Sequence, residues 1–244
     1  MTGQRERHTE AGSALIVVLL ALTLVGAVGA SLALSSSGET IVAGGFTRIQ
    51  DTRSAAEAGL ERAMADLRWI DDWRALPGGV TLSAFTDGPP AGVRRLPDGA
   101  LLDLARVVSL ANCGKTTACT SADVVANGTG QRPWGANNPV WRLFAYAPLA
   151  ALLPGGSIRS SAYVVVLIAD DPSETDANPA IDGTEPCTNG QVPPACNPGS
   201  GVLALRAEAF GPRGAHVTVE AIVERPSAPG RPVRSRAELL SGVR

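Results

Sequence analysis

Four cysteines are the residues of this chain whose type and spacing point most directly to a chemistry. They fall in two close pairs, Cys113 with Cys119 and Cys187 with Cys196, in sequence typical of loops. Four cysteines allow three disulfide pairings, and pairing within each close pair is the simplest. Four thiolates can also bind zinc, although neither pair has the tight spacing of a zinc knuckle. We therefore expect two short disulfide loops, which persist in an oxidising compartment such as the periplasm or the cell exterior.

Carboxylates are concentrated in one stretch that begins at residue 170. Five of them are candidate ligands for calcium, which binds six to eight oxygens; they are Asp170, Asp171, Glu174, Asp176 and Asp182. Their spacing does not match an EF-hand loop. Two interpretations therefore stay open, a calcium site and a solvated acidic loop, and no other cofactor is expected.

The remaining polar residues give little support for catalysis. The two histidines, His8 and His216, are remote from one another in the sequence, and no nucleophile elbow, phosphate-binding loop or zinc-protease motif is present. The formal net charge of -2 provides no positive field that would attract nucleic acid. The sequence therefore predicts that the protein is neither an enzyme nor a nucleic-acid-binding protein.

An uncharged apolar segment dominates the N-terminal part of the chain. No charged residue lies between Ser13 and Gly38, which is long enough for a helix to cross about 30 Å of hydrocarbon. Arg5 and Arg7 precede the segment, whereas the first charge after it is Glu39. This asymmetry predicts a single-pass inner-membrane protein with a cytoplasmic N-terminus and an exported C-terminal part.

A cleaved secretory signal is the main rival interpretation, because Val28 and Ala30 could form its small-residue cleavage site. Beyond Ala30, however, the helical pattern continues. Residues that recur every three or four positions are Phe46, Ile49, Arg53, Ala56, Leu60, Met64 and Leu67. We therefore expect one helix from Ser13 to Arg68, about 84 Å long at 1.5 Å per residue, with an apolar first half and an amphipathic second half.

Two motifs in this helix resemble those of a known family. The run from Glu10 through Gly12 and Ser13 to Val18 resembles the start of type IV prepilins, whose leader ends in glycine. The second motif resembles the helix signature of minor pilins of the PilX class and of the related minor pseudopilins; it comprises Ala55, Ala56, Glu57, Ala58, Gly59 and Leu60. The resemblance implies that a prepilin peptidase cuts between Gly12 and Ser13, and that Ser13 is then N-methylated.

One position departs from the pattern of this family. Most pilins have a glutamate five residues into the mature chain, where this sequence has Val17. A carboxylate inside a membrane is costly and needs a partner, so its absence changes what the helix can do in a packed bundle. The resemblance implies that a member without this glutamate is a tip or initiating subunit.

The C-terminal part has the pattern of an antiparallel sheet. Residues 71–97 are rich in glycine and proline and suggest irregular structure with short strands, and 99–111 suggests a short helix. We expect strands at 141–147 and 162–169, and a hairpin from 202–210 and 215–224 around the turn Gly211–Gly214. The expected fold class is therefore α+β, a long N-terminal helix packed on an antiparallel sheet, which is also the pilin-like fold that the resemblance implies.

These elements suggest five segments. They are a prepilin leader at 1–12, the membrane half of the helix at 13–38, its amphipathic half at 39–70, a periplasmic or extracellular head at 71–226 and a flexible tail at 227–244.

Three functions stay open. The resemblance favours a minor pilin that acts in initiation or at the tip of a type IV pilus, with a secretion pseudopilin as the alternative. Either would bind other minor and major pilins or pseudopilins, and a tip adhesin is a further candidate partner. The third possibility is a membrane-anchored periplasmic binding or scaffold protein.

Overall fold

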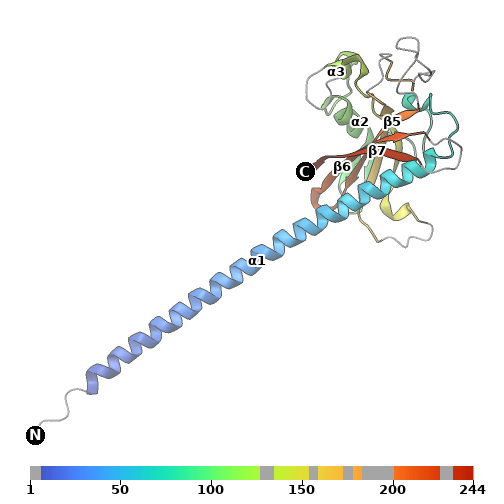
Figure 1. The fold of residues 1–244 in the computed structure, drawn as a ribbon. Coiled ribbons are helices and arrows are strands. Elements are labelled where there is room, and N and C mark those ends of the chain that lie inside the picture. The colour runs from blue at the N-terminus through green and yellow to red at the C-terminus, as the bar shows by residue number, and fades with distance from the viewer. Residues whose placement is uncertain are drawn as a thin grey trace, which may run out of the picture. The chain divides into compact units, whose positions relative to one another are not determined.

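The computed structural model describes residues 7–126, 135–153, 159–172, 178–182, 201–225 and 233–243, with the backbone alone at 7–12 and 234–243. It divides into two compact units, Met1–Thr47 and Arg48–Arg244, which are described separately below. The fold is α+β, as predicted, with one long helix and an antiparallel sheet (Figure 1).

Helix α1 runs without interruption from Arg7 to Leu67. This confirms the single helix expected from the apolar run and the helical pattern that follows it. The first unit consists of the part of α1 up to Thr47, and the second unit begins at Arg48. The compact part of the protein thus begins inside the predicted amphipathic segment 39–70 rather than after it.

The second unit is built on a five-stranded antiparallel sheet. Each strand pairs with the next one along the chain, in the order β3 (Arg142–Pro148), β4 (Tyr163–Asp170), β5 (Val202–Phe210), β6 (His216–Glu224) and β7 (Arg234–Val243). The predicted strands at 141–147 and 162–169 and the hairpin at 202–224 are confirmed. In the hairpin, Arg206 lies opposite Glu220 and Phe210 lies opposite His216. Short 3-10 helices complete this unit, namely η1 (Leu76–Gly78), η2 (Gly135–Asn137), η3 (Leu149–Ala151) and, in the hairpin turn, η4 (Pro212–Gly214).

One face of the sheet packs against the C-terminal part of α1. Buried helix residues recur at three- and four-residue intervals, which places them on one side of the helix; they are Thr52, Ala55, Ala56, Gly59, Leu60, Ala63, Met64 and Leu67. They share a core with alternate residues of the central strands, such as Val164 on β4 and Leu205 on β5. Trp73 closes the end of this core and donates a hydrogen bond from its indole N–H to the Leu67 carbonyl oxygen at 3.3 Å.

The opposite face is covered by a hairpin and a helix. Strands β1 (Val93–Arg95) and β2 (Leu101–Asp103) form an antiparallel pair, and α2 (Leu104–Cys113) follows directly, with α3 (Ser121–Val125) after it. Leu104, Val107 and Ala111 of α2 share a second core with residues of β3 and β4. The sheet is therefore sandwiched between α1 and this helical layer (Figure 1).

Two expectations were wrong in detail. Residues 234–243, expected in a flexible tail, form strand β7, which pairs with β6 along the edge of the sheet. The short helix expected at 99–111 begins only at Leu104, because Leu101–Asp103 pairs as a strand and the Asp103 carboxylate caps the helix by accepting from the Ala105 N–H at 2.9 Å. Leu101, the first residue of this strand, is 68% exposed.

Candidate functional site

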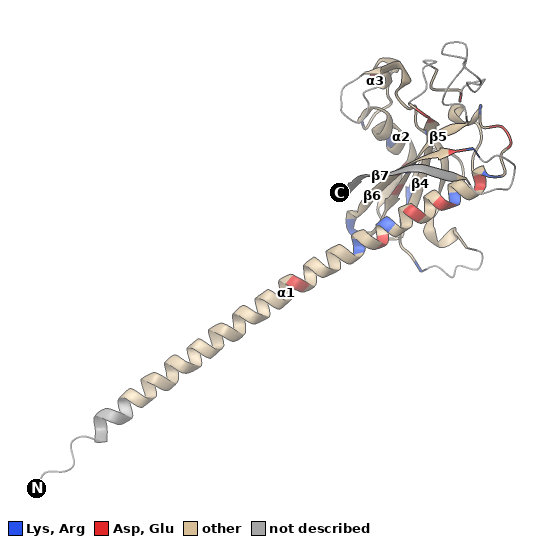
Figure 2. Cartoon of the chain, viewed as in Figure 1, with Lys and Arg blue, Asp and Glu red and all other residues tan. Residues whose placement is uncertain are grey.

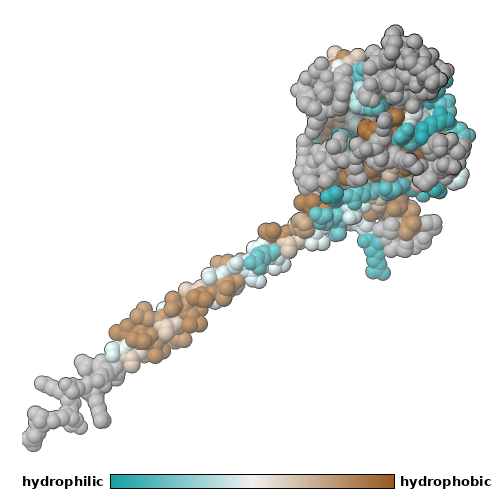
Figure 3. Space-filling model, in the orientation of Figure 1, coloured by the Kyte–Doolittle hydropathy of each residue, from teal (hydrophilic) through white to brown (hydrophobic). Residues whose placement is uncertain are grey.

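The first unit of α1 exposes an extended apolar surface (Figure 3). Its large side chains are open on all sides of the helix, and Leu24 and Val17 are 67% and 63% exposed. Soluble monomers rarely expose apolar surface of this extent, which instead marks contact with a membrane or with other apolar partners. α1 is long and apolar enough to span a membrane, and it is the one such helix among the described residues.

Several hydroxyl groups inside this segment are bonded to the helix itself. Thr23 donates to the Leu20 carbonyl oxygen at 2.9 Å, Ser31 to that of Val28 at 3.2 Å, and Ser37 to that of Ala33 at 2.9 Å. In hydrocarbon no water is present to accept such hydrogen bonds, so a hydroxyl that bonds back to its own helix is cheaper to bury there. The segment thus has few polar groups that oppose transfer out of water.

Charge is distributed very unevenly along α1 (Figure 2). Between Ser13 and Thr47 the sequence contains one charged residue, Glu39. The charges then become frequent from Arg48 onward, where Arg53 forms an ion pair with Glu57 at 2.7 Å and Arg62 with Asp66 at 3.1 Å. The nearly uncharged segment and the charged, sheet-bound segment are therefore parts of one continuous helix.

The predicted cleavage position lies within α1. Gly12 belongs to the helical backbone, and the Ser13 side chain is exposed. Val17 is exposed among other apolar side chains. Cleavage and N-methylation remain predictions.

The helix signature packs against the sheet. Ala55, Ala56, Gly59 and Leu60 are buried, whereas Glu57 points outward to Arg53 and Ala58 is half-buried. At Gly59 the helix approaches β4 so closely that an added Cβ would lie 2.3 Å from Cγ1 of Val164. The small residues of this motif thus allow close contact between the helix and the sheet.

The first predicted disulfide is confirmed. Cys113 and Cys119 are bonded, and the bond joins the end of α2 to the loop before α3. Lys115 and Asp123 span the same loop with an ion pair at 2.6 Å, and their contact, with further hydrogen bonds from Thr120, lowers the pKa of Asp123 to about 2. The predicted bridge between Cys187 and Cys196 lies outside the described residues.

The predicted calcium ligands are only partly within the described residues. Asp170, Asp171 and Asp182 are buried, while Glu174 and Asp176 fall outside the described part of the chain. The Asp182 carboxylate accepts two hydrogen bonds from the Gly201 N–H, at 2.8 and 3.1 Å, and so joins the ends of the intervening segment. Among the described residues no group of three or more His, Cys, Asp or Glu side chains is placed to bind a metal ion, and calcium binding stays a prediction.

A charged cluster on β5 and β6 was not predicted from the sequence. Glu208, whose side chain is 5% exposed, accepts hydrogen bonds from Arg206 at 2.7 Å and from His216 at 2.9 Å, and Arg206 also donates to Glu220 at 2.7 Å. The sequence predicted the hairpin itself, but not that a carboxylate on it would be buried.

No protein-family model, curated protein or solved structure matches this chain.

Proposed function

We propose that this protein is a minor pilin that takes part in initiation or tip assembly of a type IV pilus. The observation that carries the proposal is the organisation of α1. One continuous helix presents an uncharged, exposed apolar segment and then a stripe of small residues packed on an antiparallel sheet. Such a helix can leave a membrane and enter a bundle of other apolar helices while it still carries a folded head.

The sequence around the start of the apolar segment supports processing. A leader that ends at Gly12 would be removed by a prepilin peptidase on the cytoplasmic side, which leaves Ser13 as a methylated N-terminus. The protein would reside in the inner membrane with its head in the periplasm, and then move to the pilus tip. Its partners would be other minor and major pilins, and a tip adhesin is a further candidate.

Val17 supports a position at the start of the filament. A glutamate here would pair with the N-terminal amine of a neighbouring subunit, because either charge alone is costly in apolar surroundings. A subunit with valine offers no carboxylate to an earlier subunit. It can still present its own Ser13 amine to the glutamate of the next subunit, so it fits best where no earlier subunit exists.

Gold labelling of the head along sheared filaments tests this position. We expect label at filament ends, and regular labelling along the shaft would contradict the proposal. Val17→Glu should move label to internal positions, whereas the matched control Val18→Glu, with its carboxylate one position along the helix, should not. Identical labelling of Val17→Glu and the unaltered protein would show that Val17 does not set the position.

A minor pseudopilin of a type II secretion system is the alternative within the same class, since the two helix motifs are shared. A different class, a single-pass anchored periplasmic binding or scaffold protein, is favoured only by the length and apolarity of α1. That class requires no cleavage at Gly12, and the state of the N-terminus separates it from the other two.

A further inference from the structure

The exposed apolar surface of α1 continues beyond the length of helix that a membrane can cover. A helix needs about 20 residues to cross about 30 Å of hydrocarbon, and residues 13–34 provide them without a charge. Ile41, Val42 and Phe46 follow later in the helix and are 73%, 72% and 64% exposed. At 1.5 Å per residue, Phe46 lies about 18 Å beyond Leu34 along the helix axis. Lipid tails that surround residues 13–34 therefore leave these three side chains uncovered.

A polar band separates this outer apolar patch from the apolar segment before it. The band is residues 35–40, which are three serines, a glycine, a glutamate and a threonine. Ser37 and Thr40 each donate a hydrogen bond at 2.9 Å to a carbonyl oxygen of their own helix. Glu39 cannot form an ion pair in the same way, because none of the residues three or four positions from it is basic. Its carboxylate is the one charge between Ser13 and Thr47 that a partner must match.

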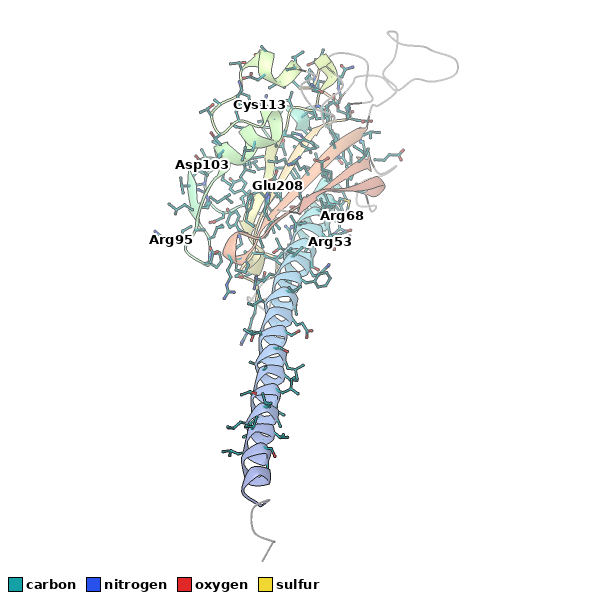
Figure 4. The ribbon with its side chains drawn as sticks, turned by 90° about the vertical axis from the view of Figure 1, so that its left-hand side faces the viewer. Arg53, Arg68, Arg95, Asp103, Cys113 and Glu208 are labelled. Carbon is teal, nitrogen blue, oxygen red and sulfur yellow. A yellow bond between two sulfur atoms is a disulfide. The ribbon has the colours of Figure 1, made fainter. Side chains whose placement is uncertain are left out.

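Glu39 belongs to a seam of side chains that are spaced alternately by four and three residues. The seam comprises Val28, Leu32, Ser35, Glu39, Val42 and Phe46. This spacing is the seven-residue repeat with which one α-helix packs along another in a left-handed coiled coil. A Cβ added at Gly38, beside the seam, would meet nothing within 4 Å, so no other part of the described chain covers the helix there. Figure 4 shows the side chains of this part of α1 projecting into open space.

The place of Glu39 in the seam determines which helix can pack on it. A second copy of the chain, anchored in the same membrane and in the same direction, would place two Glu39 carboxylates opposite each other. Like charges that face one another across an interface strongly oppose binding. A helix with a lysine or an arginine at this level would instead form an ion pair with Glu39. Charge complementarity therefore argues against a second copy and favours a different helix with a basic residue.

We propose that residues 28–46 of α1 bind the helix of a different membrane-anchored protein, which has a lysine or arginine opposite Glu39 and apolar side chains opposite Val42 and Phe46. The two apolar residues supply contact area just outside the hydrocarbon, and Glu39 selects the partner by its charge. This pairing goes beyond the proposed function, because it requires only that α1 lies in a membrane. It does not depend on cleavage at Gly12 or on assembly of a filament.

Co-purification of two differently tagged copies of the full chain from a bacterial inner membrane, in mild detergent, tests the proposal. The Glu39→Lys variant serves as the basic partner, because it keeps the rest of the seam. Recovery of the unaltered chain with Glu39→Lys should exceed recovery of two unaltered copies with each other by about tenfold, since an ion pair replaces two like charges. Glu39→Arg provides the same test if the lysine variant does not accumulate in the membrane.

Thr40→Lys is the matched control for charge. It adds the same charge one position later, about 100° around the helix and outside the seam, so it should pair with the unaltered chain no better than a second unaltered copy does. Phe46→Ala in both chains should reduce the mixed pair by about tenfold, because an apolar contact is lost. Ile41→Ala, an exposed apolar position outside the seam, should leave the mixed pair unchanged.

Three results would overturn the proposal. The first is equal recovery of the unaltered chain with a second unaltered copy and with Glu39→Lys, which would show that Glu39 does not select the partner. The second is pairing with Thr40→Lys as strong as with Glu39→Lys, which would show charge attraction without a seam. The third is a mixed pair that is insensitive to Phe46→Ala, which would place the contact elsewhere.

Discussion

Two glycines allow the helix and the sheet of the second unit to approach closely. A Cβ at Gly59 of α1 would meet Cγ1 of Val164 at 2.3 Å, and a Cβ at Gly211 in the hairpin turn would meet Oγ1 of Thr52 at 2.2 Å. Both distances are far shorter than real Cβ contacts. The conflict at Gly59 is with a packed strand, so either the helix or β4 would have to move.

Gly59→Ala should therefore destabilise the protein even though alanine favours helix. Overpacking of a core costs about 1–3 kcal/mol, against a gain in helix propensity of nearly 1 kcal/mol. Chemical denaturation of the full chain in detergent measures the difference. Gly78→Ala is the matched control, because its nearest neighbour would be the Ala180 carbonyl oxygen at an ordinary 3.7 Å.

Val164→Ala removes the atom that a Cβ at Gly59 would meet. The double variant of Gly59→Ala and Val164→Ala should lose less stability than the sum of the two single variants, because each change relieves the other. Additive losses would show that the helix and β4 are not in the close contact described here.

At the scale of elements, the strands that the sequence predicted are those whose own pattern is strong. β4 is buried on both faces and is apolar from Val164 to Ala169, and β5 and β6 alternate between the core under α1 and the opposite face. A turn with Gly211 and Gly214 separates them. The sequence of each of these strands is sufficient to predict it, because the apolar residues of its pattern are the ones that strand pairing places in the core.

The sequence did not predict structure that depends on the pairing of strands rather than on an alternating pattern within one strand. β7 follows a segment rich in proline and combines charged and apolar residues without clear alternation, and its order as a strand comes from its ladder with β6. The cluster of Arg206, Glu208, Glu220 and His216 was missed for a related reason. Its members are close only because the register sets Arg206 opposite Glu220 and Phe210 opposite His216.

The disulfide between Cys113 and Cys119 fixes the connection between α2 and α3. It closes a short loop, so its loss should lower the free energy of unfolding by less than about 3 kcal/mol. In the double variant Cys113→Ala and Cys119→Ala, hydrogen exchange should increase at Ser121–Val125 and stay unchanged in β4 and β5. A general increase across the sheet would show instead that the bond supports the whole fold.

At the scale of the whole molecule, the two units of the chain are suited to different surroundings. The second unit has two cores in contact with its sheet, whereas the large apolar side chains of the first unit are exposed. Burial of each such side chain is worth about 1.5–3 kcal/mol, so this part of α1 is stable in a membrane or among other apolar helices rather than in water. The sequence predicted an apolar segment that ends at Gly38, whereas the first unit extends to Thr47.

The state of the N-terminus follows from the proposed function. A minor pilin is anchored by α1 in the inner membrane and is released from its leader before assembly. Gly12→Arg should block that step, since the peptidase of this family requires a small residue at the cut, and the full-length precursor should then accumulate in the inner membrane. Removal of the leader at the usual position in this variant would count against the prepilin assignment.

Intact mass and N-terminal sequencing of the protein purified from its native host test the central claim most directly. We predict a mature chain that begins at Ser13 with a methylated amine, twelve residues shorter than the full sequence. A chain that still begins at Met1, or one that is cut near Ala30 by a signal peptidase, would contradict the assignment as a pilin subunit.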